Sequence, residues 1–192
     1  MALLAGTAIA ITAPFHEPAS VSRQAAQRDG AKSVRIEMAV RTQVISREIK
    51  GSFAQHPAVL GELRRFLSDE KVPTIGPVMG VYPMDPDVVP DGELRWQVAV
   101  PVSVSVRLRS PYSLAALPAG EVASLDSTVG DSHHDGLFMK KWVIDNGFVQ
   151  VAPTRMLFHD LDNADPLAAK TTIVFPVKRR QVMADLLKRP GQ

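Results

Sequence analysis

The sequence predicts an α+β fold made of two β-α-β-β units related by a pseudo-twofold axis, with a mainly antiparallel sheet and helices packed on it. Three observations support this prediction. Strand-like and helical apolar patterns follow one another in the order strand, helix, strand, strand, and this order occurs twice. A dipeptide ending in proline opens a strand at the equivalent place in each unit, at Gly76-Pro77 and Ala152-Pro153. A Pro-Val pair closes each unit, 24 residues after Pro77 and 23 residues after Pro153.

The first unit begins with a long strand over residues 34–50, in which apolar and polar side chains alternate. Apolar side chains at helical spacing then predict an amphipathic helix over 59–66. Strands rich in β-branched residues follow over 78–82 and 94–104. The segment 83–92 between them contains three prolines and a glycine, so it is predicted to be a loop.

The second unit repeats this order with looser patterns. A strand is predicted over 114–125, interrupted near Pro118, and a helix over 136–146. The closing strands are predicted over 154–159 and 171–177. Two such units related by an axis leave a cleft between them, which is where concave ligand sites tend to form.

The chain ends differ from this domain in composition. Residues 1–15 are apolar and uncharged, which indicates a signal peptide or an abbreviated membrane anchor, although no basic residue precedes them; the alternative is a buried or disordered terminal strand. Residues 16–33 resemble a linker, 34–177 form the domain, and 178–192 form a basic tail with a short helix over 181–188. That helix either docks on the domain or contacts a membrane. We therefore expect an exported or membrane-associated protein, and a cytoplasmic one otherwise.

Composition excludes several kinds of site. The 192 residues include no cysteine, which rules out a disulfide framework, a thiolate nucleophile and any zinc-ribbon or iron–sulfur centre. The 22 basic and 20 acidic residues give a net charge of only +2, so a nucleic-acid partner is not expected.

Local motifs for catalysis or metal binding are also missing. His133-His134 lies between Asp131 and Asp135, but adjacent side chains diverge too far to chelate one ion, so loop and helix-capping roles are expected there. The acidic segment 160–165 lacks the glycine and glutamate of a calcium loop. No nucleophile elbow, phosphate-binding loop, dinucleotide fingerprint or zinc-protease motif occurs. We therefore assign no catalytic residue, no metal and no cofactor.

Three motifs resemble the GyrI-like family of small-molecule effector-binding domains, which occur on transcription activators and as free-standing proteins. The first is Gly76-Pro77-Val78-Met79-Gly80-Val81-Tyr82, followed by Asp85-Pro86 and Val89-Pro90. The second is Leu117-Pro118-Ala119-Gly120, and the third runs from Ala152-Pro153 to Phe158. The resemblance covers residues 34–177. It implies a duplicated fold, shared with the SOUL haem-binding family, around a ligand cleft.

The sequence departs from that family at the position of its cleft glutamate, which holds cationic ligands and acts as an acid in hydrolytic members. Met156 stands at this position and Phe158 at the family's tyrosine, so neither cation sensing nor the family's hydrolysis is expected. The cleft that remains is apolar. The candidate ligand-binding residues are Gly80, Tyr82, Trp96, Thr154, Met156 and Phe158, unless these side chains simply fill a core. Arg155 alternates to the opposite face, where we expect it to be solvated or paired.

The leading hypothesis is a non-catalytic module that binds a neutral, apolar or aromatic small molecule in the cleft between the two repeats. A protein-interaction role like that of the gyrase inhibitors is one alternative. A hydrolase that uses groups other than the missing glutamate, such as Tyr82 or a histidine, is another. Haem binding through Met156 or a nearby histidine is a fourth hypothesis.

Overall fold

The structure is a computed structural model that describes residues 32–103 and 108–180. The signal-like segment, most of the linker and the helix expected near the C-terminus lie outside the described residues. Within the described part of the chain, neither helix has the length and apolar character needed to cross a membrane.

The first unit follows the predicted order of elements. It contains β1 (Arg35–Ala39), β2 (Thr42–Lys50), the 3-10 turn η1 (Phe53–Gln55), α1 (His56–Asp69), β3 (Val78–Tyr82), the 3-10 turn η2 (Asp91–Glu93) and β4 (Arg95–Pro101). The single strand predicted over 34–50 is two strands, separated at Val40-Arg41. Helix α1 begins earlier than predicted because Pro57 occupies its first turn, where a missing N–H group costs nothing.

The second unit repeats that order with one addition. It contains β5 (Ser113–Leu117), β6 (Gly120–Thr128), α2 (Ser132–Asp145), β7 (Phe148–Gln150), β8 (Thr154–Phe158) and β9 (Lys170–Arg179). The predicted interruption near Pro118 separates β5 from β6. The short strand β7 was not predicted, and β9 continues two residues beyond the expected end of the domain.

The prediction that the paired histidines precede the helix is wrong, because α2 begins at Ser132 and both lie in its first turn. Asp135 does not cap the helix either. Its carboxylate is buried, accepts a hydrogen bond from Ser127 Oγ (2.7 Å) and pairs with Lys32.

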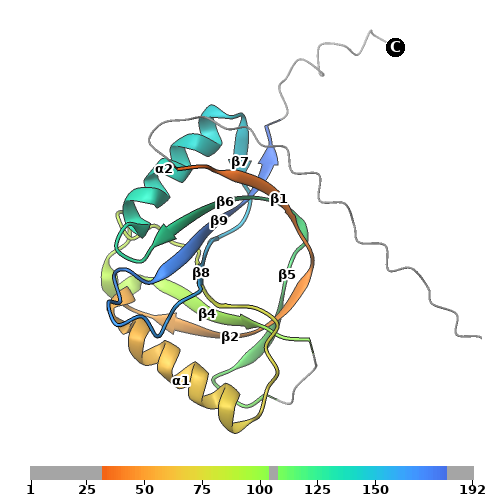
Figure 1. Ribbon diagram of the computed structural model, residues 1–192, viewed down its shortest axis with the longest axis vertical. Helices are drawn as coiled ribbons and strands as arrows, with labels where there is room; N and C mark the ends of the chain where they lie inside the picture. The colour runs from red at the N-terminus through yellow and green to blue at the C-terminus, as the bar shows by residue number, and fades with distance from the viewer. Residues whose placement is uncertain (1–31, 104–107, 181–192) are drawn as a thin grey trace, which may run out of the picture.

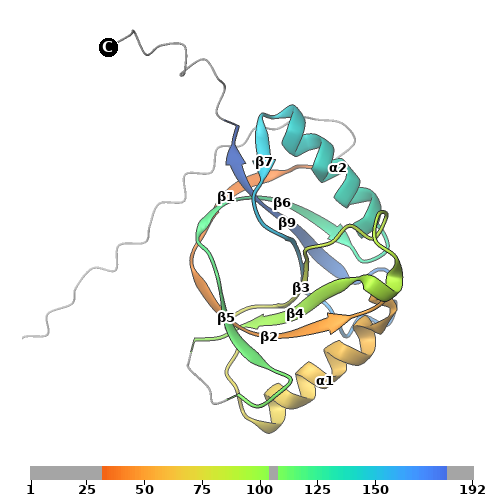
Figure 2. The ribbon, with the colours of Figure 1, turned by 180° about the vertical axis from the view of Figure 1, so that it is seen from behind.

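The strands form one sheet in the order β1-β6-β9-β8-β3-β4-β2-β5, with β7 added beside β9. Residues 35–50, which form β1 and β2, run antiparallel to residues 113–128, which form β5 and β6. The register is the same in both pairs of strands, since Ala39 faces Gly120 in β1–β6 and Thr42 faces Leu117 in β2–β5. Because β1 continues into β2 and β5 into β6, these two long segments join the ends of the sheet. The sheet therefore curls into a barrel, and both helices lie on its outside (Figures 1 and 2).

The pseudo-twofold axis passes between β3 and β8, the central strands of the order. Gly80 pairs with Met156 at the middle of this ladder, and Tyr82 pairs with Thr154 near one end. On either side lie equivalent strands, β4 and β2 in one unit and β9 and β6 in the other. The duplication inferred from the sequence offsets is therefore confirmed by the strand pairing.

Three clusters of buried side chains divide the core. One lies beneath α1 and contains Leu63 and Trp96, and the second lies beneath α2 and contains Met139 and Phe175. The third faces the barrel interior and contains Val44, Met79, Val81 and Ala99. Each helix thus fixes its own unit of the sheet, and the outer surface over β3 and β8 lies between the two helices.

Arg155 lies on the interior face of β8, as the strand alternation requires. It is only 7% exposed, and burial lowers the pKa of its guanidinium. Among the residues that the structure describes, it forms no hydrogen bond or ion pair. Arg155 is therefore much less exposed to solvent than expected, and it has no pairing partner within the described part of the chain.

Candidate functional site

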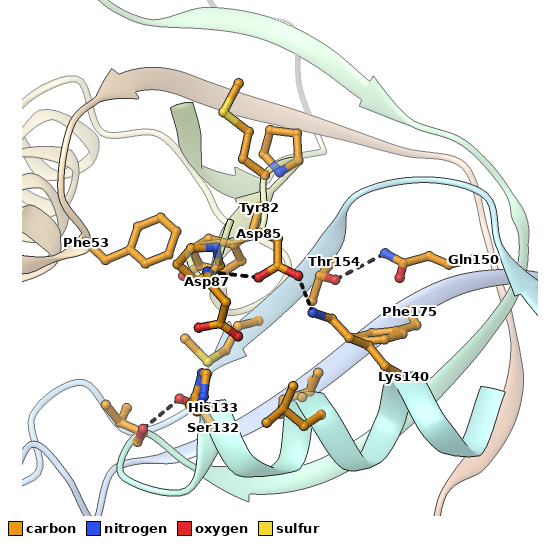
Figure 3. Close-up of a pocket in the computed structure, with 18 of the residues that line it drawn as sticks. Phe53, Tyr82, Asp85, Asp87, Ser132, His133, Lys140, Gln150, Thr154 and Phe175 are labelled. Carbon is orange, nitrogen blue, oxygen red and sulfur yellow. Dashed lines mark hydrogen bonds and ion pairs between the residues drawn. The ribbon is translucent and has the colours of Figure 1, made fainter. Parts of the chain in front are cut away.

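A pocket of about 460 Å³ opens between α1 and α2, above the central strands β3 and β8 (Figure 3). Its floor comes from the second unit and includes Met156, Ile173 and Phe175. One wall comes from the first unit and includes Phe53 and Tyr82. The pocket therefore lies at the junction of the two repeats, where the duplication predicted a cleft.

Met156 is half-buried in the floor, directly opposite Gly80 in the strand ladder. A thioether side chain adapts its shape to irregular apolar surroundings and offers no charge to a ligand. The floor is therefore apolar at the position where the resembling family carries its glutamate.

Gly80 leaves room for the side chain of Tyr82. A β-carbon at Gly80 would lie 2.0 Å from Tyr82 Oη and 2.4 Å from its Cζ atom. Among the residues that the structure describes, no other side chain comes closer to that position. The phenol ring of Tyr82 thus folds back across its own strand and places its hydroxyl over the centre of the β3–β8 ladder.

His56, at the start of α1, holds the Tyr82 hydroxyl in place. Its Nε2 atom lies 2.8 Å from Tyr82 Oη, and its Nδ1 atom lies 2.7 Å from the carbonyl oxygen of Phe53. Burial lowers the pKa of His56 and raises the pKa of Tyr82 well above its usual range. Both groups are therefore neutral near pH 7.

The hydrogen-bonded pair of His56 and Tyr82 packs against an aromatic cluster on the side away from the pocket. The rings of Trp96 and His56 lie 4.1 Å apart, and the indole Nε1 of Trp96 donates a hydrogen bond to the carbonyl oxygen of Gly51 (3.0 Å). Phe158 also lies against His56, with ring centroids 6.1 Å apart. Trp96 is fully buried and Phe158 is 7% exposed.

The six predicted site residues consequently divide into two groups. Tyr82, Thr154 and Met156 line the pocket. Gly80, Trp96 and Phe158 are buried beneath the lining and shape it indirectly. The geometry brings all six to one outer face of the sheet, as expected.

His56 and Phe53 line the pocket but were not predicted from the sequence. His56 precedes a proline at a helix start and matches no motif. The duplication did contain a signal, since His56 is five residues after Gly51 just as Asp135 is five residues after Gly130. Both residues lie in the first turn of a helix, and the side chain of each is hydrogen-bonded to a residue outside that helix.

Charged groups are confined to the mouth of the pocket. Asp85, in the loop after β3, accepts a 2.6 Å hydrogen bond from Lys140 Nζ of α2, and its carboxylate also accepts one from the backbone N–H of Asp87 (3.1 Å) (Figure 3). Lys140 is the main reason that the pKa of Asp85 lies below its usual value. This ion pair connects the two units across the opening.

The described residues include no group of three or more histidine and carboxylate side chains placed to hold a metal ion. Of the two histidines in the first turn of α2, His133 lines the pocket and His134 does not.

Comparisons with known structures identify the fold. The C-terminal domain of EcmrR superposes with a TM-score of 0.69 and 13% identity, over 78% of this chain and 99% of that domain. A hydrolase from Listeria innocua gives a TM-score of 0.54 and 12% identity, over 76% of this chain and 91% of that one. SAV2435 bound to tetraphenylphosphonium gives 0.51 and 13%, over 76% of this chain and 94% of that one.

The chain spans 58% of the EcmrR chain in its complex with DNA. No protein-family model and no curated protein sequence matches this chain. At such low identity the structural neighbours establish the fold alone. The chain shares with these structures an α+β fold with a curled, mostly antiparallel sheet and two helices, which is consistent with the GyrI-like fold that its motifs implied.

Proposed function

We propose that this protein is a non-catalytic module that binds a small, neutral, largely aromatic molecule in the pocket between α1 and α2. The single observation that carries the proposal is the pocket itself, whose volume of about 460 Å³ falls in the range of natural ligand sites. It is open between the two repeats and is not filled by its own side chains.

The chemistry of the floor favours a neutral ligand body. Met156, Ile173 and Phe175 provide apolar contacts, and no carboxylate among the described residues faces the floor. The lining carboxylates are Asp85 and Asp87, both at the mouth, and Lys140 already pairs with Asp85. A cation at the floor would lose its hydration without gaining a counter-charge.

Structural neighbours support a ligand-binding role. SAV2435, which has the same fold, binds tetraphenylphosphonium, a molecule with four aromatic rings. We infer an aromatic ligand for this chain as well, but one without the need for a fixed positive charge.

A binding role also fits the ionisation of the two polar groups in the wall. Burial keeps Tyr82 a neutral phenol and His56 a neutral imidazole, and the two hydrogen-bond each other. If the protein were a hydrolase using this pair, Tyr82→Phe would abolish turnover. In a binding module the same change only weakens affinity.

The proposal is tested with a variant that fills the pocket. Gly136 lines the pocket from α2, and a β-carbon built there meets nothing within 4 Å, so Gly136→Leu places a side chain in the open space. Gly61 of α1 is the matched control, since it also has nothing within 4 Å but does not line the pocket.

Binding of naphthalene derivatives to the full chain is measured by isothermal titration and thermal shift. A ligand at one hundred times its dissociation constant adds about 2.7 kcal/mol of stability, or a rise in Tm of roughly 5–10 °C. We expect this rise in the unmodified protein and in Gly61→Leu, and its loss in Gly136→Leu. Equal binding by both variants, or no binding of any aromatic compound, contradicts the proposal.

A further inference from the structure

The hydrogen-bond pattern around His56 fixes the position of one proton in the pocket wall. The carbonyl oxygen of Phe53 is only an acceptor, so the His56 Nδ1 atom that lies 2.7 Å from it must carry the proton. A neutral imidazole carries one N–H group, which leaves Nε2 without a proton. Tyr82 Oη, 2.8 Å away, is therefore the donor in the second hydrogen bond.

Tyr82 consequently has no proton left for a ligand. A phenol has a single O–H group, and His56 accepts it. The lone pairs of Tyr82 Oη remain, above Gly80 and next to Met156 in the centre of the ladder. At this point of the pocket wall the protein offers a hydrogen-bond acceptor in an otherwise apolar surrounding.

Ser132, at the start of α2, shows the same arrangement on the other side of the pocket. Its hydroxyl donates a 2.7 Å hydrogen bond to the carbonyl oxygen of Val129, so its oxygen also remains an acceptor. Asp85 and Asp87 at the mouth carry further acceptor oxygens, while Lys140, the lining cation, is engaged by Asp85.

Few donors balance these acceptors. The side-chain N–H groups of Gln150 are directed to Ala152 and to Thr154 Oγ1, at 2.8 and 3.1 Å. Lys140 keeps two further N–H groups at the mouth, and the hydroxyl proton of Thr154 and the ring of His133 form no hydrogen bond among the described residues. The polar part of the lining is therefore richer in acceptors than in donors.

We propose that the pocket selects an aromatic ligand that donates a hydrogen bond to Tyr82 Oη, such as an aryl alcohol or an aryl amine. The proposal rests on the proposed function, and it adds the polar group by which the ligand is recognised. An aromatic ether, a hydrocarbon or a quaternary cation without an O–H or N–H group leaves the Tyr82 lone pairs buried and unmatched, which disfavours its binding.

The test compares three ligands of similar size on the full chain by isothermal titration. 2-Naphthol donates a hydrogen bond, 2-methylnaphthalene has a methyl group in place of the hydroxyl, and 2-methoxynaphthalene only accepts. We expect 2-naphthol to bind about 10- to 100-fold more tightly than either of the others. Tetraphenylphosphonium, which has no donor, is expected to bind no better than 2-methylnaphthalene.

Two variants link this preference to the proton arrangement. Tyr82→Phe alone would leave His56 Nε2 as a free acceptor, so the first variant combines Tyr82→Phe with His56→Phe and keeps both rings. In this double variant 2-naphthol should weaken to the level of 2-methylnaphthalene, whose own affinity should not change. His56→Phe removes the acceptor of the Tyr82 proton, which frees that proton to donate; 2-methoxynaphthalene should then gain affinity relative to 2-naphthol. Circular dichroism of each variant establishes that the fold is intact.

The outcomes separate this inference from the proposed function. Equal affinity for 2-naphthol and 2-methylnaphthalene, or a preference that survives in the double variant of Tyr82→Phe and His56→Phe, overturns the inference while a ligand-binding pocket stands. If none of the aromatic compounds binds, both the inference and the proposed function are overturned.

Discussion

Gly80→Ala tests how the pocket wall is built. The added methyl group would lie 2.0 Å from Tyr82 Oη and 2.4 Å from Cζ, far inside van der Waals contact. The backbone at Gly80 has no positive φ, so alanine fits the backbone itself. The Tyr82 side chain must therefore rotate away from this position and give up its present contacts.

The cost follows from the contacts that Tyr82 loses. Its hydrogen bond to His56 is worth about 1 kcal/mol. Its edge-to-face contact with Phe53, with ring centroids 5.1 Å apart, is worth about 1 kcal/mol more. We expect a loss of about 2 kcal/mol, which lowers the Tm by roughly 4–8 °C for a domain of this size.

Urea unfolding of four proteins isolates the cause: the unmodified chain, Gly80→Ala, Tyr82→Ala and the double variant. If the clash is with Tyr82, Gly80→Ala costs about 2 kcal/mol alone and close to nothing in the Tyr82→Ala background. Gly61→Ala in the exposed interior of α1 is the control and should stabilise by about 0.5–1 kcal/mol. The same cost for Gly80→Ala in both backgrounds would refute the reasoning.

Three further changes test other parts of the structure. Burial lowers the pKa of His56, so the unfolded chain binds more protons there; stability should fall as the pH drops below 6.5, and His56→Gln should flatten that slope in urea unfolding. Arg155→Met should raise the free energy of unfolding by about 1 kcal/mol or more, because it removes a buried charge, whereas a loss would indicate an anion held by Arg155. A double-mutant cycle of Asp85→Asn and Lys140→Met should give a coupling below about 1 kcal/mol, since both side chains are partly exposed; a larger value would mean that the pair holds the two units together.

The pairing of the two central strands was predictable from the sequence, because equivalent residues of the two repeats lie at equal distances along the chain from Pro77 and Pro153. Counting three residues from Pro77 and from Pro153 gives Gly80 and Met156, which are partners in the β3–β8 ladder. Period-two alternation then placed Tyr82, Thr154 and Phe158 on the same face. Local patterns suffice for such predictions, since each strand's alternation is a property of its own residues.

The pocket wall was not predictable in the same way. His56 meets Tyr82 across 26 residues of sequence, and nothing around His56 indicates a partner. Trp96 was expected to face the cleft, but the His56 ring lies against it and separates it from the pocket. Which of these two side chains lines the pocket and which lies behind it depends on how they pack in the folded protein, and the local sequence does not specify this.

The sequence by itself determined the two β-α-β-β units, the strand faces and the apolar residue Met156 at the middle of its strand, because periodicity, proline positions and residue identity are local. The tertiary structure alone decided that the sheet closes into a barrel, that Arg155 is buried inside it, and that the Tyr82 proton is directed to His56. These features depend on contacts between residues far apart in the chain, where the geometry of the whole sheet selects one arrangement among many that the local pattern allows.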